Sequence, residues 1–159
     1  MLLLIVDLFV TVSRHIKARR TCSVGVVLPM LGSDFMKAAP VRILAVDDNP
    51  TILLCLRHIF IGPHYIVTGA ETGLEALAKL ETDPDSYDII IVDQKMPNLT
   101  GVELVGEMRK RGIVGKVIVL AAELASQIRE AFQRMDVHVI FSKPFDVEQL
   151  RSAVERLAA

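Results

Sequence analysis

Four charged side chains of this 159-residue sequence have types that could together perform phosphoryl chemistry. Asp47 and Asp48 follow one short apolar run. Asp93 follows a second run, and Lys143 follows a third. Each has an ordinary explanation when taken alone, since the first pair could supplement a helix cap at Asn49, Asp93 could be a turn residue and Lys143 a solvated loop lysine. All four nevertheless lie just after an apolar run, which favours a shared site.

Short β-branched runs alternate with amphipathic stretches from Val41 onward, a pattern typical of βα units on a parallel sheet. The expected strands, almost continuously apolar as doubly buried strands are, are Val41–Val46, Tyr65–Thr68, Ile89–Val92, Lys116–Leu120 and Val137–Phe141. The expected helices are Pro50–Ile61, Gly73–Glu81, Gly101–Arg111, Leu124–Arg134 and about Val147–Leu157. Asn49 and Asp146 suit the N-caps of the first and last helices. The sequence therefore predicts an α/β fold, a (βα)5 doubly wound sheet of five parallel strands.

The predicted topology brings the charged residues to one edge of the sheet. Right-handed crossovers place the carboxyl ends of the strands together, and ligands bind there. We therefore expect Asp47, Asp48 and Asp93 to lie near Lys143. Three close carboxylates repel one another unless a cation lies among them, and oxygen ligands with room for water suit Mg²⁺. Asp93 would then act as the nucleophile toward a phosphoryl group, with Lys143 stabilising the remaining negative charge.

Four segments carry a resemblance to a known family. They are ILAVDDNP, IIIVDQKMPNLTG, VIVLAAE and FSKPF, in matching order and spacing. From Val41 to about Leu157 the chain resembles the receiver domain of two-component response regulators. The resemblance implies a flavodoxin-like strand order 2-1-3-4-5, helices on both sheet faces and a cis peptide bond between Lys143 and Pro144. It also implies a histidine kinase or a histidine phosphotransfer protein as the phosphoryl donor.

The same resemblance assigns roles to individual residues. It implies that Asp93 is the phosphorylated residue and that Lys143 contacts the phosphoryl group. It implies a Mg²⁺ ion held by Asp48, Asp93 and the main-chain carbonyl of Lys95. Asp47 would assist the metal through water.

Two positions depart from the family pattern. Ala121 stands where receivers usually have Ser or Thr, whose hydroxyl bonds a phosphoryl oxygen. Ile140 stands where they commonly have an aromatic side chain that moves with that hydroxyl. We therefore expect Asp93 to be phosphorylated but to signal through a weaker or different rearrangement. Lys95 and Glu123 could modulate hydrolysis of the phosphoryl group as an ion pair across the site, or could be solvated charges worth less than about 1 kcal/mol.

Composition argues against several other classes of protein. The chain has 18 basic and 19 acidic residues, which leaves no electrostatic field that would hold a nucleic acid. Its glycines form no P-loop or dinucleotide fingerprint, so nucleotide hydrolysis has no support. Cys22 and Cys55 lack metal-ligand spacing, and Cys55 lies in an apolar run, which favours reduced packing thiols in a cytoplasmic protein.

Residues 1–39 form an extension distinct from the receiver-like residues 40–159. The extension begins with a twelve-residue apolar run, interrupted by Asp7, and continues with a basic cluster. A membrane-spanning helix needs about 20 residues, and a secretory signal carries positive charge before its apolar run, so neither is expected. Two interpretations stay open: a helix on a membrane surface, or a wrongly assigned start, because Met36 closely precedes the first strand.

Three functional hypotheses follow. The chain ends two residues after the last expected helix, so we expect a stand-alone receiver, a signalling protein rather than an enzyme, that acts by contact with an unknown protein target. The alternative is a receiver-like interaction module that works without phosphorylation, which Ala121 and Ile140 favour. An enzyme that transfers or hydrolyses phosphate could use the same carboxylates, but the sequence shows no second base or cap domain.

Overall fold

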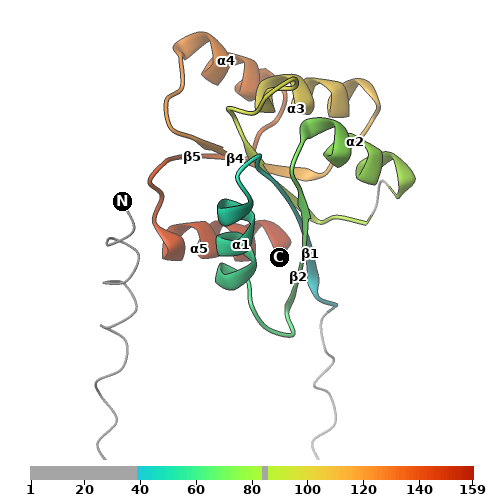
Figure 1. Cartoon of the computed structure of the whole chain (residues 1–159), viewed down its shortest axis with the longest axis vertical. Coiled ribbons are helices and arrows are strands. Elements are labelled where there is room, and N and C mark those ends of the chain that lie inside the picture. The colour runs from blue at the N-terminus through green and yellow to red at the C-terminus, as the bar shows by residue number, and fades with distance from the viewer. Residues whose placement is uncertain (1–38, 84–85) are drawn as a thin grey trace, which may run out of the picture. The chain divides into compact units, whose positions relative to one another are not determined.

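Five short strands form one parallel sheet in the computed structural model, which describes residues 39–83 and 86–159. They are β1 (Val41–Val46), β2 (Tyr65–Ala70), β3 (Ile89–Asp93), β4 (Lys116–Ala121) and β5 (Val139–Ser142). Their order across the sheet is β2-β1-β3-β4-β5 (Figure 1), which confirms the predicted doubly wound fold. The carboxyl ends of the strands therefore meet at one edge.

Helices connect the strands in strict alternation. They are α1 (Pro50–Ile59), α2 (Gly73–Thr82), α3 (Gly101–Lys110), α4 (Ser126–Arg134) and α5 (Val147–Ala158). Both predicted N-caps are confirmed. The Asn49 side chain accepts a hydrogen bond from the N–H of Thr51 at 2.9 Å, and Asp146 accepts one from the N–H of Gln149 at 2.8 Å. These bonds satisfy N–H groups that a helix start would otherwise leave without partners.

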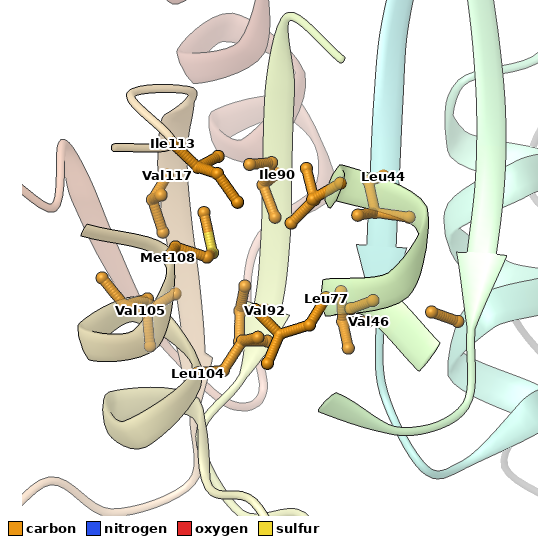
Figure 2. Close-up of a cluster of buried hydrophobic side chains, with 14 of the residues drawn as sticks. Leu44, Val46, Leu77, Ile90, Val92, Leu104, Val105, Met108, Ile113 and Val117 are labelled. Atoms are coloured by element: carbon orange, nitrogen blue, oxygen red, sulfur yellow. The ribbon is translucent and has the colours of Figure 1, made fainter. Parts of the chain in front are cut away.

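The helices cover both faces of the sheet: α2, α3 and α4 lie on one face, and α1 and α5 on the other (Figure 1). Figure 2 shows the first of the two cores, in which strand residues meet helix residues of α2 and α3. Successive residues of β3 alternate between the cores, so Ile90 and Val92 belong to the first, and Ile89 and Ile91 to the second. A shift of the β3 pairing register by one residue would exchange the side chains that face the two cores. Burial therefore fixes the register that places Asp93 at the strand end.

The predicted α4 and β5 both begin two residues too early. In the structure α4 begins at Ser126 rather than Leu124, and β5 begins at Val139 rather than Val137. Leu124 and Val137 pack against the core from loops. A prediction based on the apolar pattern therefore includes them in the helix and the strand, and starts each element two residues too early. The N–H of Val137 donates to the carbonyl of Phe132 at 3.2 Å, near the end of α4, instead of pairing with β4.

The prediction that Cys55 is a packing thiol is wrong. α1 buries Leu53 and Leu56, whereas Cys55 is an exposed free thiol. Only one stripe of an amphipathic helix faces the core, so membership of an apolar run does not decide burial. α1 also ends at Ile59 rather than Ile61, and the remaining element ends differ from the prediction by two residues or fewer.

Most of the predicted N-terminal extension lies outside the described residues, and so does Cys22. Of residues 1–39, only Ala39 is described. Within 39–83 and 86–159, none of the helices has the length and apolar character needed to cross a membrane. Both interpretations of the extension, and the division of the chain at residue 39, therefore stay predictions.

Gly101, the first residue of α3, lets this helix approach the end of β3 closely. Its N–H donates to the carbonyl of Gln94 at 3.0 Å. A Cβ at this position would lie 2.5 Å from the main-chain oxygen of Asp93, a separation that no real side chain tolerates. The absence of a side chain at Gly101 therefore sets where the main chain of Asp93 runs.

We expect Gly101→Ala to lower the free energy of unfolding by about 1–3 kcal/mol, because the added Cβ forces the backbone to shift. Gly106→Ala on the same helix should raise it by up to about 1 kcal/mol. There the nearest atom to the new Cβ is Met135 Sδ, at 3.7 Å. Urea unfolding followed by circular dichroism measures both variants. Equal losses in the two would show that contact with Asp93 is not the cause.

Candidate functional site

One lysine and two aspartates form a charged cluster at the carboxyl edge of the sheet. Lys143 Nζ lies 2.7 Å from Asp93 Oδ1 and 2.9 Å from Asp47 Oδ2. Asp47 follows β1, Asp93 ends β3, and Lys143 follows β5. Asp47 is 2% exposed and Asp93 is 5% exposed. The topology therefore brings together three of the four residues that the sequence singled out.

Main-chain N–H groups hold the second oxygen of each carboxylate. Asp47 Oδ1 accepts a hydrogen bond from the N–H of Asn49 at 2.9 Å. Asp93 Oδ2 accepts one from the N–H of Lys95 at 2.8 Å. Each carboxylate thus contacts Lys143 through one oxygen and its own following loop through the other. Aspartates commonly bond the main chain two residues on, so these local turns fix the orientation of both carboxylates.

The main chain of Lys143 is fixed by the neighbouring strand. Its N–H donates to the carbonyl of Ala121, the last residue of β4, at 2.7 Å. The peptide bond between Lys143 and Pro144 is cis, which confirms what the family resemblance implied. The end of β4 therefore determines where the Lys143 side chain leaves the sheet.

Burial and charge pairing shift the pKa values of the cluster. Burial raises the pKa of Asp47, because the hydrogen bonds from Lys143 and from the N–H of Asn49 offset the lost hydration only in part. Burial alone would lower the pKa of Lys143, but its hydrogen bonds to Asp93 and Asp47 outweigh this effect and raise that pKa. Lys143 is therefore a firmly held cation at neutral pH.

Asp48 does not belong to this cluster, since its side chain is exposed. In the part of the chain that the structure describes, no three acidic, His or Cys side chains surround a point where a metal could bind. The sequence predicts a cation among three carboxylates, and here the Lys143 ammonium supplies that charge for Asp47 and Asp93. The predicted donors still fit Mg²⁺ by chemistry, because carboxylates and the Lys95 carbonyl offer the oxygen ligands it prefers.

Ala121 and Ile140 are the two positions that depart from the family pattern. Ala121 is 3% exposed, and Ile140 is half-buried against the core. Lys95 and Glu123 are both exposed, and within 39–83 and 86–159 the two are not paired with each other or with another charged residue. They line a common pocket of about 530 Å³ instead. The ion pair considered from the sequence is therefore not formed.

Gln94 is the residue that sequence reasoning missed. It follows Asp93 directly and is 8% exposed, although it lies in a loop. Its N–H donates to the carbonyl of Leu120 in β4 at 2.9 Å. The only signal in the sequence was a polar residue next to the candidate nucleophile. Its burial depends on the approach of α3 at Gly101, which no periodicity reveals.

The family model of the response regulator receiver domain matches residues 43–155, which is more than half of the chain. The chain therefore belongs to the response regulator receiver family, whose members are signalling domains of two-component systems. The fold, the strand order and the position of the charged cluster agree with this assignment.

Individual relatives agree with the family. Sporulation initiation phosphotransferase F of Bacillus subtilis is 28% identical, over 72% of this chain and 91% of its own length. Response regulator MprA of Mycolicibacterium vanbaalenii is 32% identical over 74% of this chain, which spans only 50% of that protein. The crystal structure of response regulator TrrA of Thermotoga maritima, in complex with Mg(2+)-BeF, is 34% identical and covers 74% of this chain and 98% of its own, with a TM-score of 0.63.

We expect Lys143→Met to lower the free energy of unfolding at pH 7.5 by about 3 kcal/mol, because it leaves two buried carboxylates without their counter-charge. The deficit should shrink as the pH falls toward 4 and the unpaired carboxylates take up protons. In the wild type the pKa of Lys143 is raised, so its contribution is complete below the ordinary lysine value of 10.5 and is lost as the pH rises through the folded-state value.

Urea unfolding at a series of pH values measures this prediction. Lys110→Met is the matched control, since Lys110 is 73% exposed beside Glu107 and such pairs contribute about 1 kcal/mol or less. A deficit in Lys143→Met that is the same at pH 4 and pH 7.5 would contradict the role given to the carboxylates.

Proposed function

We propose that this chain accepts a phosphoryl group on Asp93, in two-component signalling, from a phosphohistidine of a histidine kinase or a histidine phosphotransfer protein. One observation carries the proposal: the buried Asp93 carboxylate has one oxygen 2.7 Å from the Lys143 ammonium. Membership of the receiver family supports it. The sporulation phosphotransferase, which the chain matches over 91% of that protein's length, supports the phosphorelay context.

The side chains of the cluster suit a transfer to an aspartate. A carboxylate oxygen of Asp93 attacks phosphorus, the phosphorus–nitrogen bond of the donor breaks, and the nitrogen keeps the electron pair. Lys143 lies where the negative charge of the phosphoryl oxygens gathers, so it stabilises both the transition state and the aspartyl phosphate. Burial of Asp93 strengthens this interaction, because water screens it little.

The proposed cofactor is Mg²⁺, held by Asp48, Asp93 and the Lys95 carbonyl, with Asp47 assisting through water. When bound, the ion supplies positive charge that neutralises phosphoryl oxygens. The Thermotoga maritima receiver forms a complex with Mg(2+)-BeF, which supports the same cofactor here. The Asp48 side chain is exposed, so its carboxylate is accessible to an arriving ion.

In the proposed role the phosphorylated receiver acts by contact with a downstream protein, and it works in the cytoplasm. The free thiol of Cys55 suits a reducing compartment. The buried side chain of Ala121 favours a second candidate function, an interaction module that works without phosphorylation. Ala121 cannot give the phosphoryl group the hydroxyl bond on which the usual receiver switch depends. Phosphorylation of Asp93 separates the two candidates.

Incubation with Mg²⁺ and a small phosphodonor should add a labile phosphoryl group to the wild type but not to Asp93→Asn. Asp83→Asn is the matched control and should be labelled like the wild type, since Asp83 is an exposed residue at the end of α2. Intact-mass measurement detects the adduct. Labelling of Asp93→Asn to the wild-type extent would refute the assignment, and failure of the wild type to react would favour the interaction module.

Ala121→Thr tests which conformational change follows phosphorylation of Asp93. We expect the hydroxyl to change the phosphorylation-dependent hydrogen exchange of residues 121–134 little, because Ile140 cannot supply the coupled aromatic movement. Ala121→Val, which has the same shape without the hydroxyl, separates packing from hydrogen bonding. A large new exchange response in the Thr variant alone would show that the usual switch lacks only its hydroxyl, against the expectation of a different rearrangement.

A further inference from the structure

The imidazole of His138 takes the place of a main-chain acceptor at the amino end of β5. The register of β4 and β5 pairs Ile118 with Val139. Continued toward the amino ends of the strands, this register would direct the N–H of Val117 to the carbonyl of Val137. That N–H donates instead to Nδ1 of His138, at 3.2 Å. The His138 N–H donates to the carbonyl of Val117 at 3.0 Å, so one residue bonds both main-chain groups of Val117.

The main chain that precedes β5 turns away from β4. Asp136 has a positive φ of 53°, a left-handed conformation that interrupts an extended chain. The N–H of Val137 donates to the carbonyl of Phe132, which belongs to α4, at 3.2 Å. This segment is therefore tied to the helix rather than to the neighbouring strand. The His138 side chain supplies the acceptor that the main chain does not bring to Val117.

This hydrogen bond requires a neutral imidazole. The N–H of Val117 is a donor, so Nδ1 of His138 has to offer a lone pair, and the ring proton of the neutral form lies on Nε2. Protonation of Nδ1 turns the acceptor into a donor that faces another donor. Val117 is 0% exposed, so water cannot reach its N–H unless the chain opens locally. Protonation of His138 therefore leaves a buried N–H without a partner, which destabilises the closed arrangement.

The surroundings of the ring favour its neutral form. Partial burial lowers the pKa of His138 below its usual value, and the charges of Arg109 in α3 and Lys116 in β4 lower it further. Asp136, in the loop before β5, opposes this shift of the His138 pKa in part. The folded protein thus takes up this proton at a lower pH than the unfolded chain does. The contribution of His138 to stability is complete above the ordinary value of 6.5 and is lost as the pH falls through the folded-state value.

We propose that His138 makes the junction between α4 and β5 sensitive to pH: in mildly acidic conditions the protonated ring releases Val117, and the amino end of β5 separates from β4. β5 lies at the edge of the sheet and pairs with β4, so within the described chain no strand holds it from the other side. Its carboxyl end is held separately, because the N–H of Lys143 donates to the carbonyl of Ala121 at 2.7 Å. The release is therefore local, and it does not depend on phosphorylation of Asp93.

Amide hydrogen exchange, followed by NMR between pH 7.5 and pH 4.5 and corrected for the intrinsic rate at each pH, tests the proposal. In the wild type the protection factor of the Val117 amide should fall about tenfold over this range, as expected for one lost hydrogen bond. The protection factor of the Lys143 amide should change less than about twofold. His138→Asn places an amide oxygen where Nδ1 lies and does not titrate, so it should protect Val117 throughout. His138→Leu has no acceptor and should show the low protection at every pH.

His64→Asn is the matched control, since His64 is exposed directly before β2, and it should keep the wild-type pH dependence at Val117. Constant protection of Val117 in the wild type down to pH 4.5 would overturn the proposal. An equal fall in His138→Asn would overturn it as well, because another group would then be responsible. A parallel loss at Lys143 would contradict a local release. If His138→Leu does not fold, the wild type and His138→Asn still give the decisive comparison.

Discussion

The bonding of one lysine ammonium to two buried carboxylates is the interaction on which the functional edge of this protein depends. Asp47 and Asp93 are almost fully buried and would repel each other strongly without Lys143. The three residues leave the sheet from β1, β3 and β5, so no local segment can form the cluster. It exists only if the strands adopt the order and register that the two apolar cores impose.

The sequence predicts the fold and the cluster because both follow from simple regularities. Doubly buried strands are continuous apolar runs, and a parallel sheet gathers whatever follows them at one edge. Asp93 and Lys143 are therefore identifiable from the residue pattern alone. The burial of Gln94 and the exposure of Asp48 are not, because they depend on which way a loop residue turns. The close approach of Gly101 to β3 makes that choice for Gln94.

Two energetically unfavourable groups of the described chain lie near the proposed phosphoacceptor. Burial raises the pKa of Asp47, and Gln94 keeps an oxygen atom without a hydrogen-bond partner. Folded proteins tolerate such unfavourable groups mainly at functional sites, where favourable interactions elsewhere offset their cost. Packing in the two apolar cores offsets that cost here. Ala121 has the opposite character, since it packs well in the core but gives up a hydrogen-bond donor.

The most direct measurement of the central claim locates the acyl phosphate chemically. The wild type is incubated with Mg²⁺ and phosphoramidate, reduced with borohydride, digested and sequenced by mass spectrometry. Reduction of an aspartyl phosphate converts that aspartate to homoserine. We expect homoserine at position 93, with none at Asp47 or Asp48. Homoserine at either of those positions, or phosphate on a histidine with none at Asp93, would contradict the assignment of Asp93 as the phosphoacceptor.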